Sequence, residues 1–388
     1  MKYMWQSLKM GCKEIMHRWV LYLFAVVVVP LAMTAFFVSF LHEGVAERVP
    51  CAVVDLDGSS MSRNLVRNLD ALQQVDVCGK CESYVQAMTL VKRGDIVGFF
   101  MIPEGFGRDV LSGRQPVLTY YVNFGYIVPA SLLTEGFTTI SLLSNAAVEQ
   151  SVLRAEGLPD EEIVPRVQPI INNIHRIGNP EMNYGVYLTN SFAPGVLALM
   201  VLIVSTYNIT AEITRGTSRR WMRVGGNSVV IALVGKLMPL TMLFTIVGWV
   251  MQIVFYVVAD YPMHGSMCVM FLAMFLLVVA CQALSVMICA IVPNPRYALS
   301  VCSLVGMLAF SLCGYSFPVE NMYPGIGVFS HILPMRYYFL IYVDQALNGL
   351  PFVYSRMSFV SLSVFPILAL IMLPLLKRAM LRLVVYVP

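Results

Sequence analysis

The stretch MCVMFLAMFLLVVACQALSVMICAIV, residues 267–292, contains no charged side chain. Apolar runs of about 18 or more residues predict membrane-spanning helices, because in lipid each backbone polar group must find its partner within the same helix. Five further runs carry at most one charge each. The six runs are residues 19–41, 187–210, 229–258, 267–292, 297–317 and 357–376. They predict a polytopic α-helical membrane protein with six transmembrane helices.

The composition of the whole chain agrees with this class. Of the 388 residues, 58% are hydrophobic and 12% are charged, whereas charged residues make up about 25% of a soluble globular protein. The core of a soluble domain is too small to bury so many apolar side chains. The net charge of +4 reflects membrane topology, and we draw no inference of nucleic-acid binding from it.

The first run is too long for the apolar region of a signal peptide and lacks a cleavage site of small residues, so we expect a retained helix. It follows a basic stretch that contains Lys2, Trp5, Lys9, Lys13 and Arg18. Two interpretations of this stretch are open. It forms an amphipathic helix on the membrane surface, or it is the ordinary positive flank of a first span.

Lys and Arg residues indicate which side faces the cytoplasm. The segments predicted to be cytoplasmic hold 13 of the 26 Lys and Arg residues, whereas the short opposite loops hold only Arg336 and Arg356. Short cytoplasmic loops are enriched in Lys and Arg, and this bias sets the orientation. Both termini are therefore predicted to lie in the cytoplasm, and residues 42–186 outside it.

Residues 42–186 have the composition of a soluble domain and contain 17 of the 22 acidic residues. Strand patterns lie near residues 50–57, 75–77, 96–102 and 117–122, with helical patterns between them. This alternation favours an α/β fold with a mixed sheet. We expect an inserted extracytoplasmic domain over 42–186, between a first segment and span at 1–41 and five further spans within 187–388.

The apolar stretch at residues 127–152 is interrupted by Glu135, Asn145 and Glu149. We interpret it as a long amphipathic helix packed on the domain. If it crossed the bilayer instead, the number of spans would be seven. The distribution of Lys and Arg would then no longer distinguish the cytoplasmic side from the other side.

Three cysteines, Cys51, Cys78 and Cys81, fall in the predicted external domain. A lone C-x-x-C at residues 78–81 lacks the second pair that would indicate a zinc site. An oxidising compartment permits a disulfide with one thiol left over, and the sequence leaves that question open.

Two connections between spans stand out. Residues 212–226 are basic and short, which suits either a helix at the cytoplasmic membrane face or a plain basic loop. Residues 318–350 hold apolar segments too short to cross and too apolar for a water-exposed loop, which predicts re-entrant or interfacial helices. Glu320 and Arg336 lie in this segment, where charges are either functional or paired, or extend to the headgroups.

No catalytic constellation is visible in the sequence. There is no G-x-x-x-x-G-K-[ST] phosphate loop and no H-E-x-x-H zinc motif. The spans hold no ionisable side chain at mid-depth for proton relay, and Lys236 lies near a predicted cytoplasmic end. We therefore expect no cofactor in this chain, with energy supplied by a partner or an ion gradient.

Three motifs resemble those of the ABC-2 family of ATP-binding-cassette exporter permeases, in particular members with a large domain after the first span. Asn179-Pro180 followed by Pro194-Gly195 is similar to a pair at the entry to the second span. Residues 212–217 resemble Glu-x-x-x-Gly-Thr at the family's coupling helix, and residues 317–334 resemble its outer re-entrant signature. The resemblance covers nearly the whole chain.

The resemblance implies a homo- or heterodimer of permeases in the bilayer, bound to cytoplasmic ATPase subunits that bind the ATP. Coupling to the ATPase would then run through Glu212, Arg215, Gly216 and Thr217. The departure is at residues 218–226, where Ser218-Arg-Arg-Trp221 and Gly225-Gly226 stand in place of the family's acidic residue and proline turn. The resemblance also implies that the outer re-entrant segment of this chain uses Pro318, Glu320, Pro324, Pro334 and Arg336.

Members with such a domain often work with a membrane-fusion adaptor and an outer-membrane channel, which implies the inner membrane of a Gram-negative cell. Drugs or other amphipathic small molecules are the expected cargo. Export of a glycan or lipid-linked polymer is the runner-up, and a non-transporting mechanotransmission protein driven by an ATPase is a third possibility. A membrane-embedded enzyme is disfavoured because clustered His, Asp or Cys residues are missing.

Overall fold

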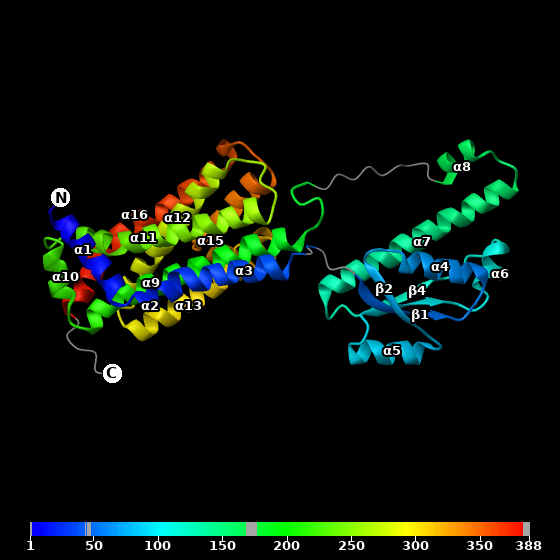
Figure 1. The fold of residues 1–388 in the computed structure, drawn as a ribbon, viewed down its shortest axis with the longest axis horizontal. Helices are drawn as coiled ribbons and strands as arrows, with labels where there is room; N and C mark the ends of the chain where they lie inside the picture. Colours follow the sequence, from blue (N-terminus) through cyan, green and yellow to red (C-terminus); the bar gives the residue numbers. More distant parts are fainter. Residues whose placement is uncertain (1, 43, 45–47, 168–176, 383–388) are drawn as a thin grey trace. The chain divides into compact units, whose positions relative to one another are not determined.

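The computed structural model describes residues 2–42, 44, 48–167 and 177–382 (Figure 1). It divides into two compact units: residues 1–44 with 175–388, and residues 45–174. We call the first the helical unit and the second the sheet unit. The predicted external domain had wider bounds, 42–186. Parts of both connections, residues 43, 45–47 and 168–176, lie outside the described residues.

Seven described helices are long and apolar enough to cross a membrane. Six of them belong to the helical unit and correspond to the six predicted runs. They are Trp19–Phe40 (α2 Trp19–Tyr22, η1 Leu23–Val28, α3 Val29–Phe40), Gly185–Thr214 (η2 Gly185–Thr189, α9 Asn190–Thr214), Val229–Val258 (α11 Val229–Ile253, η3 Val254–Val258), α12 Met267–Ile291, α13 Pro295–Leu312 and α16 Phe352–Arg382. The seventh is α7, Ile127–Ala155, in the sheet unit.

The helical unit packs around α12, which contacts α16, α9 and α11. Small buried residues on α12, among them Ala273, Ala280 and Ser285, allow close approach of neighbouring helices. Loop residues set the starts of the spans: Ser228 caps α11 by accepting a hydrogen bond from the amide of Ile231, and Asn294 precedes Pro295 at the start of α13.

The basic N-terminal stretch forms α1, Lys2–His17, which packs along α11. Its buried residues Ser7 and Gly11 lie one turn apart, and a Cβ on Gly11 would come within 3.0 Å of the Lys236 carbonyl oxygen. Gly235 on α11 is tighter still, because its added Cβ would lie 2.5 Å from that of Ser7. Small residues at helical spacing permit this approach. Neither interpretation of the N-terminal stretch included this contact.

The connection between α13 and α16 folds as short helices, η4 Val319–Asn321, α14 Pro324–Ser330, α15 Pro334–Tyr342 and η5 Val343–Leu347. Pro324 and Pro334 occupy the first positions of α14 and α15, where the missing proline N–H has no partner to lose. The axes of the two helical segments bend by 81° at the break between them. A bent pair of this kind is either a broken span or a re-entrant loop.

The chain leaves and re-enters the helical unit at one point. Gly44 follows α3, and its carbonyl oxygen accepts a hydrogen bond from the amide of Tyr184, just before η2. Asn179 and Asn183 brace this point by exchanging two hydrogen bonds, from the Asn179 amide to the Asn183 carbonyl and from the Asn183 N–H to the Asn179 side chain. The Asn-Pro motif thus forms the return turn next to the end of the first span.

The sheet unit has a four-stranded mixed sheet in the order β2-β1-β3-β4. The first three strands are parallel and β4 is antiparallel to β3. The four predicted strands are confirmed as β1 Val49–Asp55, β2 Val75–Cys81, β3 Gly98–Ile102 and β4 Thr119–Val122. The helices are α4 Ser60–Asp70, α5 Tyr84–Arg93, α6 Phe106–Leu111, α7 and α8 Asp160–Val167.

Helices cover both faces of this sheet. On one face, Cys51 and Val53 of β1 pack with α4 and with Leu133 and Phe137 of α7. On the other face, Ala52 and Val54 pack with α5, as the positions of α5 and α7 in Figure 1 show. Cys81 belongs to the second face and Cys51 to the first, since alternate strand residues point to opposite sides. All nine cysteines are free in this structure.

A substitution in the sheet tests this packing. Gly98 lies where β3 meets β4 and α7, and an added Cβ would fall 2.4 Å from the Tyr121 carbonyl oxygen and 2.9 Å from Leu133. We expect Gly98→Ala to lower the unfolding free energy of a 45–174 fragment by about 1–3 kcal/mol, as overpacking does. Circular dichroism during urea unfolding measures this.

Gly79→Ala is the matched control, because no atom lies within 4 Å of its added Cβ on β2. It should leave stability within about 0.5 kcal/mol of the wild type. Equal effects of the two substitutions, or a fragment without mixed α and β signals, would contradict the described packing.

Candidate functional site

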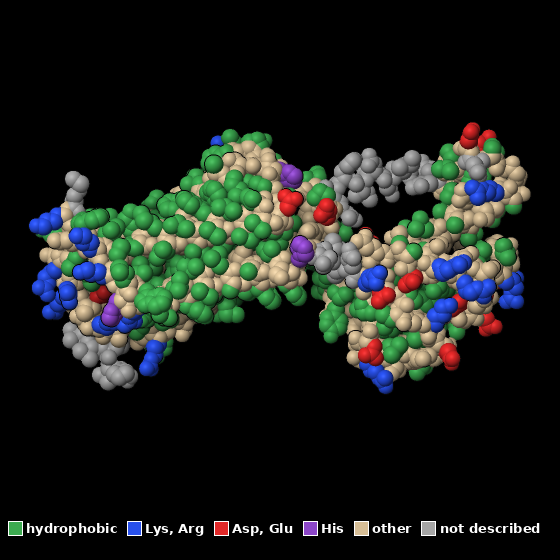
Figure 2. All heavy atoms as spheres, viewed as in Figure 1, with side chains coloured by type: hydrophobic (Ala, Val, Ile, Leu, Met, Phe, Trp, Pro, Cys, Tyr) green, Lys and Arg blue, Asp and Glu red, His purple; other side chains and the backbone are tan. Residues whose placement is uncertain are grey.

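Basic side chains gather at one end of the helical unit. Figure 2 shows Lys and Arg residues over this end, where Figure 1 places α1 and α10, Ser218–Val224, whereas hydrophobic side chains cover the middle of the unit. We call it the basic end. A wide apolar surface over the spans suits lipid, and the basic residues border it.

A buried ion cluster lies at the basic end, centred on Lys236. This residue is seven positions into α11, about 10 Å along the helix from its start, and its side chain is 1% exposed. Its Nζ lies 2.9 Å from Oε2 of Glu14 on α1 and 2.5 Å from Oε1 of Glu212 on α9. Arg215 adds a further contact, with its Nη1 3.5 Å from Oε1 of Glu14. We call these four residues the Lys236 cluster.

The Lys236 cluster is neutral overall, because it contains two carboxylates, one ammonium and one guanidinium group. The Glu14 and Glu212 side chains are 12% and 4% exposed. Removing one partner from a buried pair leaves a charge that is neither solvated nor paired, which is strongly destabilising. The cluster therefore holds α1, α9 and α11 in one arrangement.

Helix α10 is attached to the same cluster. The Thr217 hydroxyl donates a hydrogen bond to the Glu212 carboxylate, and the Ser218 hydroxyl donates to the Glu212 carbonyl oxygen at 3.1 Å. Trp221 donates through Nε1 to the Ala232 carbonyl oxygen of α11 at 3.1 Å, and the Lys236 Nζ lies 4.9 Å from the centre of its ring. These contacts hold α10 against α9 and α11.

The opposite face of α10 is free and basic. Ser218, Trp221 and Met222 are buried, whereas Arg219, Arg220 and Arg223 are exposed. The described part of the chain places no acidic side chain in contact with these three arginines. The helix therefore presents positive charge outward from an anchored position.

The structure changes the interpretation of residues 212–226. They do not form one short helix: α9 continues to Thr214, the chain turns at Gly216, and α10 begins at Ser218. The turn occurs because Gly216 adopts a φ of +66°, which side chains disfavour. An added Cβ at Gly216 would meet no atom within 4 Å, so conformation and not crowding explains the glycine.

The family resemblance implied that Glu212 takes part in coupling to a partner ATPase. The Glu212 carboxylate points inward to Lys236 and Thr217. Of the predicted coupling residues, Glu212, Arg215 and Thr217 come together around the Lys236 cluster, and Gly216 forms the turn beside it.

The predicted outer residues lie at the other end of the helical unit. Arg336 of α15 is buried, and its Nη2 lies 3.6 Å from Oε1 of Glu320, whose side chain is 76% exposed. Pro318 precedes η4, while Pro324 and Pro334 begin α14 and α15. Glu320 and Arg336 are therefore paired with each other.

Sequence reasoning missed Glu14, Trp221 and Lys236 as members of one site. A signal was present: Lys236 is the one charged residue inside the six apolar runs, and Glu14 and Glu212 are the two acids among the segments predicted to be cytoplasmic. A buried ammonium group requires a carboxylate partner. Among the described residues, no group of three or more His, Cys, Asp or Glu side chains could hold a metal ion.

A family model described as ABC-2 family transporter protein matches residues 19–374. No curated protein matches the chain.

A substitution at Lys236 tests the ion cluster. Lys236→Met removes the ammonium group and leaves the Glu14 and Glu212 carboxylates facing each other without it. We expect a loss of about 3–5 kcal/mol in stability, because a buried charge loses its partner. Thermal unfolding of the purified protein in detergent, followed by tryptophan fluorescence, measures the drop in Tm.

Arg296→Met is the matched control, because Arg296 is an exposed basic residue on α13. It should change Tm little. Adding Glu212→Gln to Lys236→Met should cost less than the sum of the two single changes, since each already breaks the same pair. Additive effects would show that Lys236 and Glu212 do not interact.

Proposed function

The chain belongs to the ABC-2 transporter family, and from this premise we propose that it is the permease subunit of an ATP-driven exporter. The family comprises membrane components of transporters whose ATPase resides in a separate subunit. The 388 residues contain no phosphate loop of the G-x-x-x-x-G-K-[ST] type. ATP would therefore be bound and hydrolysed by partner subunits that contact this chain.

The observation that carries the proposal is the anchored position of α10. It joins α9 to α11, its buried face is attached through Thr217, Ser218 and Trp221, and its exposed face is basic. A rigid helix between two spans can pass the movement of a docked ATPase to both of them. The Lys236 cluster extends this connection to α1, so the movement would reach three helices.

The proposed topology has six spans with both termini in the cytoplasm. The six long apolar helices of the helical unit supply the spans. The basic end faces the cytoplasm, because short cytoplasmic segments are enriched in Lys and Arg. The sheet unit would lie outside. Its helix α7 would not cross the membrane, because Leu133, Phe137 and Ile140 pack into the core of the sheet unit.

Cargo and partners follow from the family resemblance and stand as proposals. Two permeases would form a homo- or heterodimer in the inner membrane of a Gram-negative cell, with two ATPase subunits below. The sheet unit would meet a membrane-fusion adaptor and an outer-membrane channel. Drugs or other amphipathic small molecules are the proposed cargo, since the predicted apolar runs hold one charged residue, Lys236, and it is paired.

Energy coupling is tested by Glu212→Gln in the complex with its ATPase subunits. This change keeps the side-chain size and removes the charge that pairs with Lys236. We expect cargo-stimulated ATPase activity to fall at least threefold, because α10 loses part of its attachment. The assay is phosphate release by the complex in proteoliposomes.

The matched control is Arg296→Gln, in the other predicted cytoplasmic connection and outside the Lys236 cluster. Copurified ATPase subunits and gel filtration show whether each variant is assembled. Full stimulation in the assembled Glu212→Gln complex would refute coupling through α10.

Two native cysteines test the topology. Cys12 on α1 and Cys78 on β2 are both exposed, and Cys268→Ser removes the third exposed thiol. A membrane-impermeant maleimide should label Cys78 in intact spheroplasts and Cys12 only after permeabilisation. Cys51 should stay unlabelled, because burial raises the pKa of its thiol to about 12 and maleimides react with thiolates.

The labelling rate of Cys78 should increase with pH. Partial burial, and then the neighbouring Asp76, raise the pKa of this thiol, so the reactive thiolate becomes more abundant as the medium becomes more alkaline. Cys78→Ser and Cys12→Ser identify the two signals. Labelling of both residues from the same side would exclude the six-span arrangement.

A further inference from the structure

A long groove runs along the helical unit between α11, α12 and α16. Its volume is about 840 Å³, within the range of small-molecule sites. Met242, Ile246 and Leu370 lie on its wall and are 53%, 53% and 52% exposed, so the groove opens on the surface that faces lipid. Apart from Thr241, Thr245 and Gln282, the described residues that line it are apolar, and none of them carries a charge.

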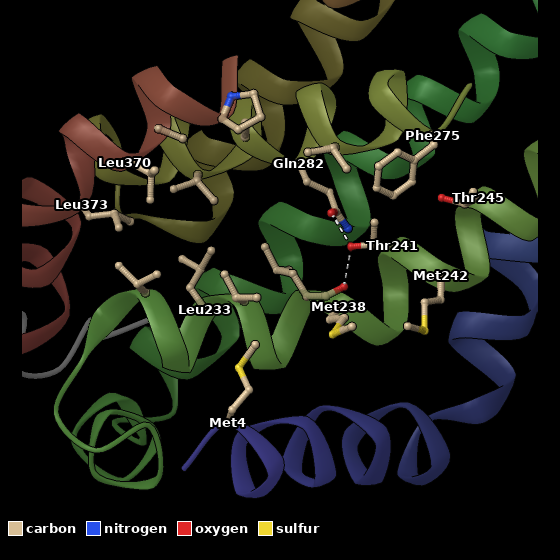
Figure 3. Close-up of a pocket in the computed structure, with 18 of the residues that line it drawn as sticks. Met4, Leu233, Met238, Thr241, Met242, Thr245, Phe275, Gln282, Leu370 and Leu373 are labelled. Atoms are coloured by element: carbon tan, nitrogen blue, oxygen red, sulfur yellow. Dashed lines mark hydrogen bonds between the residues drawn. The ribbon is translucent and has the colours of Figure 1, made fainter. Parts of the chain in front are cut away.

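The three polar residues lie well inside helices α11 and α12, which are proposed to span the membrane. Thr241 is 12 positions from the start of α11, about 18 Å, and Gln282 is nine positions from the end of α12, about 14 Å. The hydrocarbon core is about 30 Å thick. Figure 3 shows Gln282 and Thr241 reaching toward each other from α12 and α11, with Thr245 one turn further along.

Two polar atoms of these three residues have no hydrogen-bond partner among the described residues. The Thr241 hydroxyl lies 2.7 Å from the Gln282 Oε1 and 3.0 Å from the Leu237 carbonyl oxygen, and the shorter contact leaves the Gln282 amide nitrogen facing away from Thr241. Among the described residues, neither this nitrogen nor the Thr245 hydroxyl has a hydrogen-bond partner, although the two side chains are only 6% and 5% exposed. Unpaired polar groups are costly in an apolar medium, and water is scarce at this depth.

We propose that the groove binds an uncharged amphipathic molecule whose apolar chain lies along α11 and whose carbonyl oxygen accepts hydrogen bonds from Gln282 and Thr245. An ordinary phospholipid fits poorly, because its polar groups stay at the membrane surface and only hydrocarbon reaches mid-depth. A charged ligand is excluded, because the described wall offers it no counter-charge and burial of an unpaired ion is costly.

This site is separate from the Lys236 cluster, since none of the cluster residues lines the groove. Binding requires no ATP hydrolysis. That the bound molecule is the exported cargo rests on the proposed function, whereas binding itself does not. A measurement without ATPase subunits therefore tests the site alone, and its failure would leave the coupling proposal standing.

The test uses two diazirine photoprobes on the full-length protein in lipid nanodiscs. One probe is a long-chain fatty acid methyl ester, and the other is the alkane of equal length without the carbonyl group. Labelled peptides are identified by mass spectrometry. We expect the ester to label residues 230–249 and 275–286 about tenfold more than the alkane does.

Gln282→Leu should reduce ester labelling about three- to tenfold, the loss of one hydrogen bond in an apolar site. Alkane labelling should not change. Thr245→Val, which keeps the side-chain shape, should reduce ester labelling in the same direction, and Thr210→Val on α9, outside the groove, should not. If Gln282→Leu loses both signals through misfolding, Thr245→Val decides.

Equal labelling by ester and alkane in the wild type would overturn the proposal. The groove would then be a surface that only contacts lipid acyl chains. Unchanged ester labelling in both Gln282→Leu and Thr245→Val would overturn it as well. Absence of labelling in the wild type would show that the groove is filled by protein, as a second copy of the chain would do.

Discussion

A buried ammonium group must be neutralised where it lies, and Lys236 imposes this condition on the helical unit. Its two carboxylate partners come from α1 and α9, which lie far apart in the sequence. Because an unpaired charge at this depth costs several kcal/mol, α1, α9 and α11 cannot separate freely. Helix α10 joins this arrangement through Thr217 and Trp221. The basic end thus behaves as one connected element.

Polar and charged side chains find their partners in different ways at the two ends of the helical unit. At the basic end, charges are paired inside the protein, and three arginines of α10 remain outward. At the opposite end, Arg336 pairs with an exposed carboxylate, that of Glu320, and tyrosine hydroxyls connect the bent segment to the spans. Tyr342 donates to the Val186 carbonyl oxygen, and Tyr338 accepts from Gln252. No described loop joins α10 to the bent segment, so the two ends are connected through the long helices between them.

The sequence was sufficient to predict the apolar spans and the strands, since both produce local patterns of side chains. Ser59 and Ser60 both suit the cap of the helix after β1, and the structure assigns the cap to Ser59, which accepts a hydrogen bond from the amide of Ser62. The Lys236 cluster was not predicted, because Glu14 and Lys236 are joined only by tertiary packing and no periodicity links them. Gly216 was predicted only as a coupling residue, and its positive φ, with no atom close to an added Cβ, shows that a turn of the backbone explains the glycine. The groove was also invisible, because apolar wall residues and lipid-facing residues have the same composition.

Hydrogen exchange of the backbone amides tests most directly whether Lys236 links the elements of the basic end. In Lys236→Met, we predict faster exchange in both α1 and α10 than in the wild type, although more than two hundred residues separate them in sequence. Exchange in the sheet unit should not change. Acceleration in α1 with unchanged exchange in α10, or no acceleration in either helix, would contradict the account.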